Sequence, residues 1–511
     1  MSQLDTSSIP EKEMAGLTNL LLVVTLLLVF LMASRTPLDT DMWWHLRSGQ
    51  VMVESGKPLL TDVFSYTRVG ADWTNHSWLG EVLLYGIFQL AGWVSVSAWM
   101  GICAVLAAWF IWMQIRGGAF LKAGFVLLAS VVSAPLWTPR PQLFSLVFLA
   151  ALAWLVKGWL EKGGRRIWLI LPLFVLWSNL HGGFVLGILY LITLALGVFL
   201  DGLFDESAIR PARLNQAKIL VVSAIGGYAV AAINPNGYKM WLIPFETVGV
   251  GVLRQFIQEW ASPDFHSPEV WPFAFFVVLL LVIQSLHAKR ASFQNLIPGS
   301  FFILLALFAR RNIAAAAMVA TPWLVSSWLD VMSNINFSAF VPEKIQGYLA
   351  KYRSAKAPGA SNHLTHVLNL GIAAFLGLVC FFKLGGVTHP VLVDAFIQKS
   401  LPVEAVAYLK STPSKEGRLF NTYNWGGYLI YNYPEQKVFV DGRTDLFRDE
   451  ILGEWLTVIQ AGDGWQASLE KWGVTRILIE PDRPLAKVLP YNGWIETYRD
   501  SVAVVYEKAA D

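Results

Sequence analysis

Long apolar runs alternate with short polar segments over the first three quarters of the chain. A bilayer core of about 30 Å needs roughly 20 apolar residues per helix, and fewer where a helix is buried among others. The run 78–91 is apolar but short and contains Glu81, so it is predicted to lie at the membrane interface; the alternative, a twelfth span, would invert the topology. The sequence predicts eleven spans, near 15–34, 93–115, 120–136, 142–157, 167–179, 183–200, 217–233, 270–286, 294–309, 312–329 and 366–384.

Lysines and arginines in the short loops predict the orientation, because positive residues are retained on the cytoplasmic side. The opening segment is acidic and has no small-residue cleavage site before the first apolar run, unlike a secretory signal peptide. We expect an integral protein of the cytoplasmic (inner) membrane, with the N-terminus inside and 35–92, 234–269 and 385–511 outside. Every inner loop is then basic, with Arg116, Lys122, Lys157, Lys162, Arg165, Arg166, Arg210, Arg213, Lys218, Lys289, Arg290, Lys344, Lys351, Arg353 and Lys356.

The last part of the chain has the shorter pattern of a water-soluble α/β domain. Strand-like runs lie at 437–443, 475–480 and 501–508, and helix-like runs lie at 402–411, 450–461 and 465–472. Gly and Pro residues around 385–402 mark the boundary. The expected fold is therefore mostly α: a polytopic transmembrane helical bundle over 1–384, with a first extracytoplasmic loop at 35–92, and a C-terminal extracytoplasmic α/β domain over 385–511.

Composition excludes several classes of protein. Hydrophobic residues make up 55% of the chain and charged residues 15%, which excludes an ordinary cytosolic protein. The net charge of +3 is too small to indicate nucleic-acid binding. Cys103 and Cys380 each lie inside an apolar run, so neither a disulfide framework nor a thiolate metal site is indicated.

The first outer loop opens with the densest group of ionisable residues in the sequence, in TPLDTDMWWHLRSGQ. Asp39 and Asp41 can share a divalent cation, or one can act as a base while the other orients it. A solvated loop with a helix cap is the alternative, but ionisable residues at a membrane are costly and favour function. His45 and His76 are further candidates to bind substrate, although a single histidine is more often structural.

Other polar residues fall at span ends on the same face. Asn179 and His181 lie at a helix break, and Arg140 begins a span. Arg310 and Arg311 stand where the distribution of positive charge disfavours arginine, so each is expected to bind either a carboxylate of the first loop or the phosphate of a lipid substrate. The candidate substrate-binding residues are Arg140, Arg310, Arg311, His181, Asn179, His45, His76 and Glu259.

Two motifs stand out in the soluble domain. In LFNTYNWGGYLIY, Gly426 and Gly427 permit a tight turn or a close backbone approach. In VFVDGRTDLF, Asp441 and Arg443 are expected to pair and brace the domain, while a role of Asp441, Arg443 and Asp445 in binding an acceptor is the alternative.

Taken together, the acidic pair, the interfacial helix, the many spans and the C-terminal domain resemble the GT-C superfamily of membrane glycosyltransferases. This superfamily includes oligosaccharyltransferases, protein O-mannosyltransferases and the aminoarabinose transferases of lipid A. The architecture matches over nearly the whole chain, whereas the residue match is narrow. In the superfamily the acidic residue of the first loop is catalytic, which maps onto Asp39 or Asp41, and we favour Asp41. WGGY at 425–428 is similar in position to the acceptor-binding WWDYG motif of oligosaccharyltransferases but lacks its aspartate.

The resemblance implies transfer of a sugar from a polyprenyl-phosphate-linked donor to a glycan, lipid or protein acceptor. Asp41 would be the base and Asp39 its helper or a metal ligand. Arginines, a divalent metal (Mg²⁺ or Mn²⁺, at Asp39 and Asp41), or both would neutralise the leaving phosphate. A non-catalytic subunit or lipid-binding scaffold on the same fold is the rival. A transporter ranks third, because the ionisable residues gather at one face and no repeat is seen.

Overall fold

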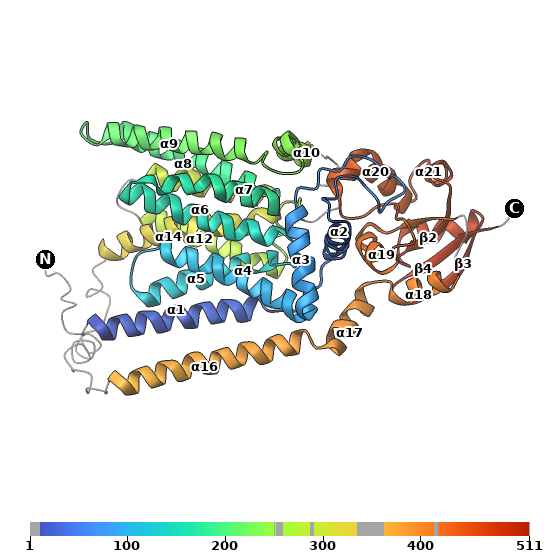
Figure 1. The fold of residues 1–511 in the computed structure, drawn as a ribbon, viewed down its shortest axis with the longest axis horizontal. Helices are drawn as coiled ribbons and strands as arrows, with labels where there is room; N and C mark the ends of the chain where they lie inside the picture. The colour runs from blue at the N-terminus through green and yellow to red at the C-terminus, as the bar shows by residue number, and fades with distance from the viewer. Residues whose placement is uncertain are drawn as a thin grey trace.

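The computed structural model describes residues 11–249, 251, 259–286, 291–334, 362–412 and 417–509. A bundle of long helices forms one end of the molecule, and a small α/β domain that carries the C-terminus forms the other (Figure 1). Helices occupy all eleven positions expected of spans: α1 (Glu11–Ala33), α4 (Trp93–Gln114), α5 (Ala119–Ser133), α6 (Gln142–Lys162), α7 (Ile170–Leu180), α8 (Phe184–Phe204), α9 (Arg210–Val230), α12 (Trp271–Leu286), α13 (Phe293–Phe308), α14 (Ile313–Asn334) and α16 (Asn362–Val387).

The surface of the bundle requires a lipid environment. Within the described residues, eight helical segments are long and apolar enough to cross a bilayer, and α13 is a shorter apolar helix. Only 6% of the apolar window of α16 is buried, and Leu370, Phe375 and Phe381 are among its exposed side chains. The protein is therefore an integral membrane protein with multiple spans. Of the basic loop residues, those outside the described residues are Lys289, Arg290, Lys344, Lys351, Arg353 and Lys356.

The first outer loop forms a folded layer between the bundle and the α/β domain. It contains α2 (Met42–Ser55) and α3 (Trp78–Ala91). Figure 1 shows α3 running crosswise to the bundle helices, as expected of an interfacial helix and not of a twelfth span. The two helices pack so closely that a Cβ atom at Gly49 would lie 2.2 Å from the carbonyl oxygen of Glu81. This layer therefore holds the start of α2 in a fixed position over the bundle.

The C-terminal domain is built on a four-stranded mixed sheet with the order β1-β2-β4-β3. β1 (Arg418–Asn421) runs parallel to β2 (Val474–Ile479), and β4 (Val504–Lys508) is antiparallel to both β2 and β3 (Trp494–Arg499). The strands expected at 475–480 and 501–508 are β2 and β4, whereas β1 and β3 were not predicted. The helices of the domain and of the connection to α16 are α17 (Pro390–Ser400), α18 (Val403–Ser411), α19 (Gly426–Asn432), α20 (Thr444–Ile459), α21 (Trp465–Lys471) and α22 (Pro484–Val488).

The prediction of a strand at 437–443 is wrong. This buried run joins no named strand, and its one bridge is a parallel contact of Val438 with Ser65 of the first outer loop. The side chain of Asn421 replaces a ladder, because its amide nitrogen donates to the carbonyl of Val440 (2.8 Å) and its oxygen accepts from the amide of Phe439 (2.8 Å). One buried side chain thus satisfies backbone groups that a neighbouring strand would otherwise pair.

A sealed ion cluster joins this run to the first outer loop. Arg443 donates two hydrogen bonds to Asp441, from Nε (2.8 Å) and Nη2 (2.7 Å), as expected of an internal bracing pair. Its Nη1 lies 2.7 Å from Oδ1 of Asp62, in an ion pair without hydrogen-bond alignment. All three side chains are fully buried. The domain is therefore fixed against the loop that carries the acidic pair.

The WGGY segment makes the close approach that its glycines permit. A Cβ atom at Gly426 would lie 2.2 Å from the carbonyl oxygen of Val440, and one at Gly427 would lie 2.7 Å from that of Thr40. Thr40 stands between the two aspartates of the acidic pair. The glycines thus let the start of α19 press directly on the backbone that positions Asp39 and Asp41.

Candidate active site

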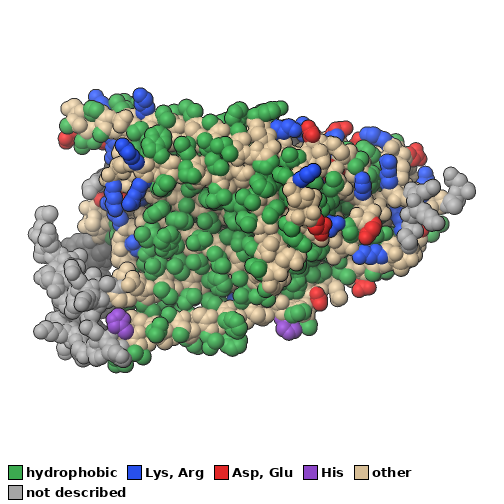
Figure 2. Space-filling view, viewed as in Figure 1, with side chains coloured by type: hydrophobic (Ala, Val, Ile, Leu, Met, Phe, Trp, Pro, Cys, Tyr) green, Lys and Arg blue, Asp and Glu red, His purple; other side chains and the backbone are tan. Residues whose placement is uncertain are grey.

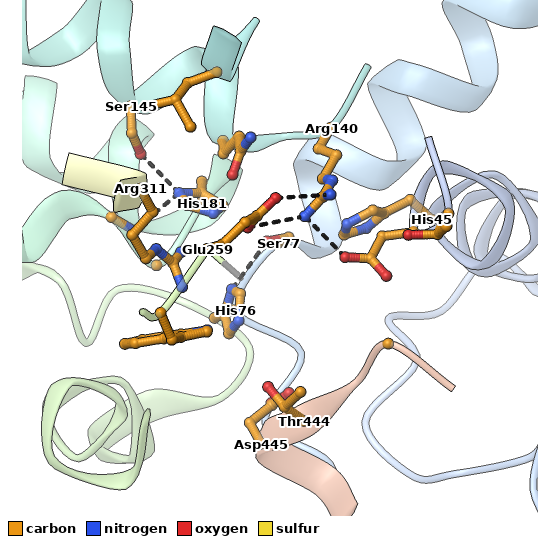
Figure 3. A pocket seen from close by; sticks show the side chains of 18 of the residues that line it. His45, His76, Ser77, Arg140, Ser145, His181, Glu259, Arg311, Thr444 and Asp445 are labelled. Carbon is orange, nitrogen blue, oxygen red and sulfur yellow. Dashed lines mark hydrogen bonds and ion pairs between the residues drawn. The ribbon is translucent and has the colours of Figure 1, made fainter. Parts of the chain in front are cut away.

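A cavity of about 740 Å³ lies where the bundle, the first outer loop and the C-terminal domain meet (Figure 3). Its bundle side is formed by the start of α6, the turn between α7 and α8, and the short helix η5 (Arg310–Asn312). Its domain side is formed by Thr422, Tyr423, Asn424, Gly442, Thr444, Asp445, Trp455 and Arg483. Of the site residues expected from sequence, those that line it are Asp41, His45, His76, Arg140, His181, Glu259 and Arg311.

Arg140 is the centre of a group of three carboxylates. Its Nε and Nη2 donate to the two oxygens of Asp39 (2.6 and 2.7 Å). Its Nη1 lies 2.9 Å from Oδ2 of Asp41, and its Nη2 lies 3.0 Å from Oε1 of Glu259. Prolines at positions 139 and 141 restrict the backbone on both sides of the arginine, so Arg140 has a fixed backbone position just before the start of α6. We name these four residues the Arg140 cluster.

The carboxyl group of Asp41 lies on the cavity and is partly cut off from water. Burial raises the pKa of Asp41 to about 7. Attraction by Arg140 lowers this pKa, but repulsion from Asp39 and Glu259 partly offsets that attraction. The backbone of Gly442 closes over it, so closely that a Cβ atom there would clash with Oδ1 of Asp41. Asp41 therefore exchanges a proton near neutral pH, which suits a general base.

Burial lowers the pKa of each of the three histidines of the cavity below the ordinary value, so all three are neutral. His45 shares a buried hydrogen bond with Oε1 of Glu81 (2.9 Å), and burial raises the pKa of Glu81 to about 8. Nδ1 of His181 accepts from the amide of Gly183 (3.0 Å), so its ring proton is on Nε2. The rings of His76 and His181 meet edge to face, 5.7 Å apart. These groups offer hydrogen bonds without adding charge.

Arg310 and Arg311 have different surroundings although they are neighbours in sequence. Nη2 of Arg310 pairs with Glu269 (2.8 Å), and Arg310 does not line the cavity. Arg311 lines the cavity, and its guanidinium stacks 4.2 Å from the ring centre of Trp260. Within the described part of the chain, no ion pair is seen for Arg311. The expected clamp of three arginines is therefore divided: one is bound elsewhere, one is surrounded by carboxylates, and one faces the cavity.

Asn179 is a structural residue in this fold. Its amide nitrogen donates to the carbonyls of Val175 (2.7 Å) and Ile233 (2.8 Å), and its oxygen accepts from Nε1 of Trp78 (2.9 Å). It ties α7 to the end of α9 and to α3, and it does not line the cavity. Of the two residues at this helix break, His181 therefore lines the cavity and Asn179 does not.

A divalent metal does not fit the carboxylates as they stand. Both oxygens of Asp39 are taken by Arg140, which also lies against Asp41 and Glu259. Among the described residues, no group of three or more His, Cys, Asp or Glu side chains is placed to hold a metal ion. The expectation of Mg²⁺ or Mn²⁺ at Asp39 and Asp41 is therefore not supported by their geometry.

Several cavity residues were not found from the sequence. Ser145 donates to Nδ1 of His181 (2.7 Å) and accepts from Nε1 of Trp177 (2.8 Å), but nothing in its apolar run signals this position. Asn424 and Thr444 line the domain side together with Asp445, which the sequence had offered as a possible acceptor-binding residue. The side chains of these last three residues make no hydrogen bond or ion pair with any residue that the structure describes.

Comparison with known proteins gives similarity of fold without similarity of sequence. No protein-family model matches the chain, and no curated protein sequence matches it. The apo crystal structure of the Archaeoglobus fulgidus oligosaccharyltransferase matches 96% of this chain and 74% of its own, with a TM-score of 0.50 and 13% identity. The chain has a GT-C fold.

A second structure with the GT-C fold matches equally well. It is the oligosaccharyltransferase AglB of Archaeoglobus fulgidus in complex with an inhibitory peptide and a dolichol-phosphate. It covers 98% of this chain and 74% of its own, with a TM-score of 0.51 and 12% identity. At such identities the comparison establishes the GT-C fold alone, so the chemistry must be argued from the cavity.

Proposed function

We propose that the protein is a membrane glycosyltransferase that moves a sugar from a polyprenyl-phosphate-linked donor to an acceptor outside the cytoplasm. The observation that carries this proposal is the cavity, which brings a carboxyl group with a pKa of about 7, Asp41, together with an arginine that faces the cavity, Arg311. The GT-C fold supports it, and AglB, a protein of this fold, has been solved with a dolichol-phosphate bound.

The proposed step is a displacement at the anomeric carbon of the donor sugar. An acceptor hydroxyl oxygen forms the new bond to that carbon as the bond to the donor phosphate oxygen breaks. The hydroxyl proton passes to Asp41, and the phosphate leaves with the bonding electron pair. Arg140 holds Asp41 in place through the ion pair at 2.9 Å.

Arg311 is the group best suited to bind the leaving phosphate. Stacking on Trp260 fixes its plane, and a guanidinium so fixed can donate two parallel hydrogen bonds to a phosphate. Arg140 already donates to carboxylates, and Arg310 already pairs with Glu269. Arg483 also lines the cavity, but it pairs with Glu480 (2.7 Å). Of the described arginines that line the cavity, Arg311 is therefore the one whose charge is left for the phosphate.

The domain side of the cavity is suited to a hydroxylated acceptor. Asn424, Thr444 and Asp445 present amide, hydroxyl and carboxylate groups there, and none of these side chains bonds to another described residue. Such groups hydrogen-bond readily to the hydroxyls of a glycan. WGGY lacks the aspartate of the acceptor-binding motif of oligosaccharyltransferases and instead makes a glycine contact to the backbone, which favours a glycan or lipid acceptor over a peptide.

The distribution of charge supports the proposed orientation. Figure 2 shows Lys and Arg side chains at the end of the bundle away from the C-terminal domain, an apolar band between, and mixed charges over that domain. Since basic loops are retained in the cytoplasm, the N-terminus lies inside and the cavity outside. Residues 1–384 would then be the membrane domain and 385–511 an extracytoplasmic domain.

The proposal is tested by Asp41→Asn, assayed for transfer from a polyprenyl-linked sugar. This change keeps the size of the side chain but removes its charge, so we expect the rate to fall by at least about 10²-fold with little change in melting temperature. Asp72→Asn is the matched control, because Asp72 lies in the same loop but pairs with Lys239 at the surface. Full activity in both Asp41→Asn and Asp39→Asn would refute the enzyme proposal and leave a non-catalytic scaffold.

A further inference from the structure

The arrangement around Arg140 resembles the surroundings of a metal ion, with a guanidinium in place of the ion. Five carboxylate oxygens, from Asp39, Asp41 and Glu259, lie within 3.4 Å of the guanidinium nitrogens. The three carboxylates come from two segments far apart in sequence, the first outer loop and the segment before η4 (Pro268–Val270). Without a cation between them, these negative charges would repel one another.

Arg140 is built into the fold more firmly than an exposed ion-pair partner would be. The exposed fraction of its side chain is 15%, and that of Asp39 is 8%. Burial works to lower the pKa of Arg140, but the carboxylates of Asp39, Asp41 and Glu259 outweigh this and raise the pKa well above its ordinary value. The guanidinium is therefore a permanent cation at this position.

We propose that Arg140 serves as a fixed internal cation that takes the place of a divalent metal ion, so that the carboxylates of the site are organised and the reaction proceeds without a metal. This rests on the proposed function for its catalytic meaning, although the placement of the cation does not. Arg140 acts through Asp41 and Glu259, and is thus a positioning residue.

The substitution has a chemical consequence for Asp41. A divalent ion carries twice the charge of a guanidinium and would coordinate the carboxylate directly, which lowers its basicity. With a single positive charge on Arg140, the three carboxylates keep an excess of negative charge. This excess of negative charge leaves Asp41 able to accept a proton from the acceptor.

Mn²⁺ binding to the purified full-length protein tests the inference without any sugar substrate. After treatment with a chelator, Mn²⁺ is added up to about 1 mM, the weak end of carboxylate sites. The free ion is measured by its electron paramagnetic resonance signal, and the melting temperature is recorded in parallel. We expect the wild-type protein to bind no stoichiometric Mn²⁺ and to show no shift in melting temperature. Its transfer activity should persist in EDTA.

The variant Arg140→Ala should reverse this behaviour. It should melt at a lower temperature than wild type, bind one Mn²⁺, and regain melting temperature when Mn²⁺ is added. The double variant Arg140→Ala with Asp39→Asn should lose that binding. Arg140→Lys is the matched control, because it keeps a cation and should bind no Mn²⁺. A folded Arg140→Ala protein that binds no Mn²⁺ would overturn the proposal.

The wild-type titration is decisive even if Arg140→Ala does not fold. Stoichiometric Mn²⁺ binding by wild type that Asp39→Asn or Glu259→Gln abolishes would overturn the inference. Mn²⁺ binding is measured without donor or acceptor, so its result is independent of sugar transfer. Failure of the proposed function would appear instead as unchanged transfer in Asp41→Asn and Asp39→Asn.

Discussion

Among the residues that the structure describes, two clusters have carboxylates around one arginine, and the clusters differ mainly in exposure. In the cluster of Arg443, Asp62 and Asp441, every side chain is 0% exposed. In the Arg140 cluster, the exposed fractions are 15% for Arg140, 20% for Asp41 and 28% for Glu259. The first joins the C-terminal domain to the outer loop, and the second opens on the cavity. The same side-chain chemistry thus forms a structural ion-pair cluster in one place and a candidate reaction site in the other.

Aromatic packing explains why the first cluster is sealed. The guanidinium of Arg443 lies 4.9 Å from the ring centre of Trp73 and 5.1 Å from that of Phe64. These rings exclude water and leave no space for a ligand. The Arg140 cluster has a cavity on one side in place of such rings. Solvent access, and not the choice of ion pair, therefore separates the structural from the functional role.

Removing the sealed arginine should have the largest effect on stability. Arg443→Met leaves Asp62 and Asp441 buried without a cation, so we expect a loss of about 3–5 kcal/mol in the free energy of unfolding. Thermal and denaturant unfolding in detergent would measure it. Arg310→Met is the control, because its partner Glu269 is 52% exposed and a half-exposed pair contributes about 0–1 kcal/mol. Equal losses in the two variants would contradict the distinction between sealed and open pairs.

Arg311→Gln should have a smaller effect, on donor binding and not on stability. Loss of its hydrogen bonds to a phosphate should cost about 1.5–3 kcal/mol, which is roughly a 10- to 100-fold rise in donor KM. Arg310→Gln is matched in chemistry and adjacent in sequence, but Arg310 is bound to Glu269 outside the cavity. A rise in donor KM for Arg310→Gln, or no rise for Arg311→Gln, would contradict the assignment of the phosphate to Arg311.

Much of the fold follows from the sequence because membrane spans are local signals. The lengths of the apolar runs predicted all eleven bundle helices and the crosswise helix α3. The α/β domain was harder. β1 has four residues, and in β3 only the first residue, Trp494, is buried, so β3 lacks the alternation of a half-buried strand. The run 437–443 looked like a strand, but its backbone is paired by Phe64 and Tyr66 of the first outer loop at Val438 and by the side chain of Asn421 at Phe439 and Val440.

The sequence predicted that polar residues gather at one face but not how they pair. Arg310 and Arg311 lie in the 3₁₀ turn η5, where successive side chains point about 120° apart. One therefore reaches Glu269 while the other reaches the cavity, and no local pattern distinguishes them. The pairing of Arg140 with Glu259 depends on the packing of distant segments, so it could be seen only in the structure.

The pH dependence of transfer sharpens the comparison further, because only the open cluster can exchange protons with solvent. If Asp41 is the base, kcat/KM should rise with pH through an apparent pKa of about 7. The folding stability changes with pH in the opposite direction to the rate. The pKa of Asp41 is raised from 3.8 on folding, so between about pH 4 and pH 7 the folded state keeps a proton that the unfolded state releases. Stability should therefore fall as pH rises through this window, and Asp41→Asn should remove that dependence.

Glu259→Gln tests the origin of this pKa, and its effect should be the smallest. Repulsion from Glu259 helps to raise the pKa of Asp41, so neutralising Glu259 should move the acid limb of the rate profile to lower pH. Arg140 would also be left to pair more fully with Asp41, which acts in the same direction. Glu269→Gln is the control, since Glu269 does not line the cavity and should leave the profile unmoved. An acid limb that stays in place in Glu259→Gln, or moves to higher pH, would show that a group other than Asp41 sets the profile.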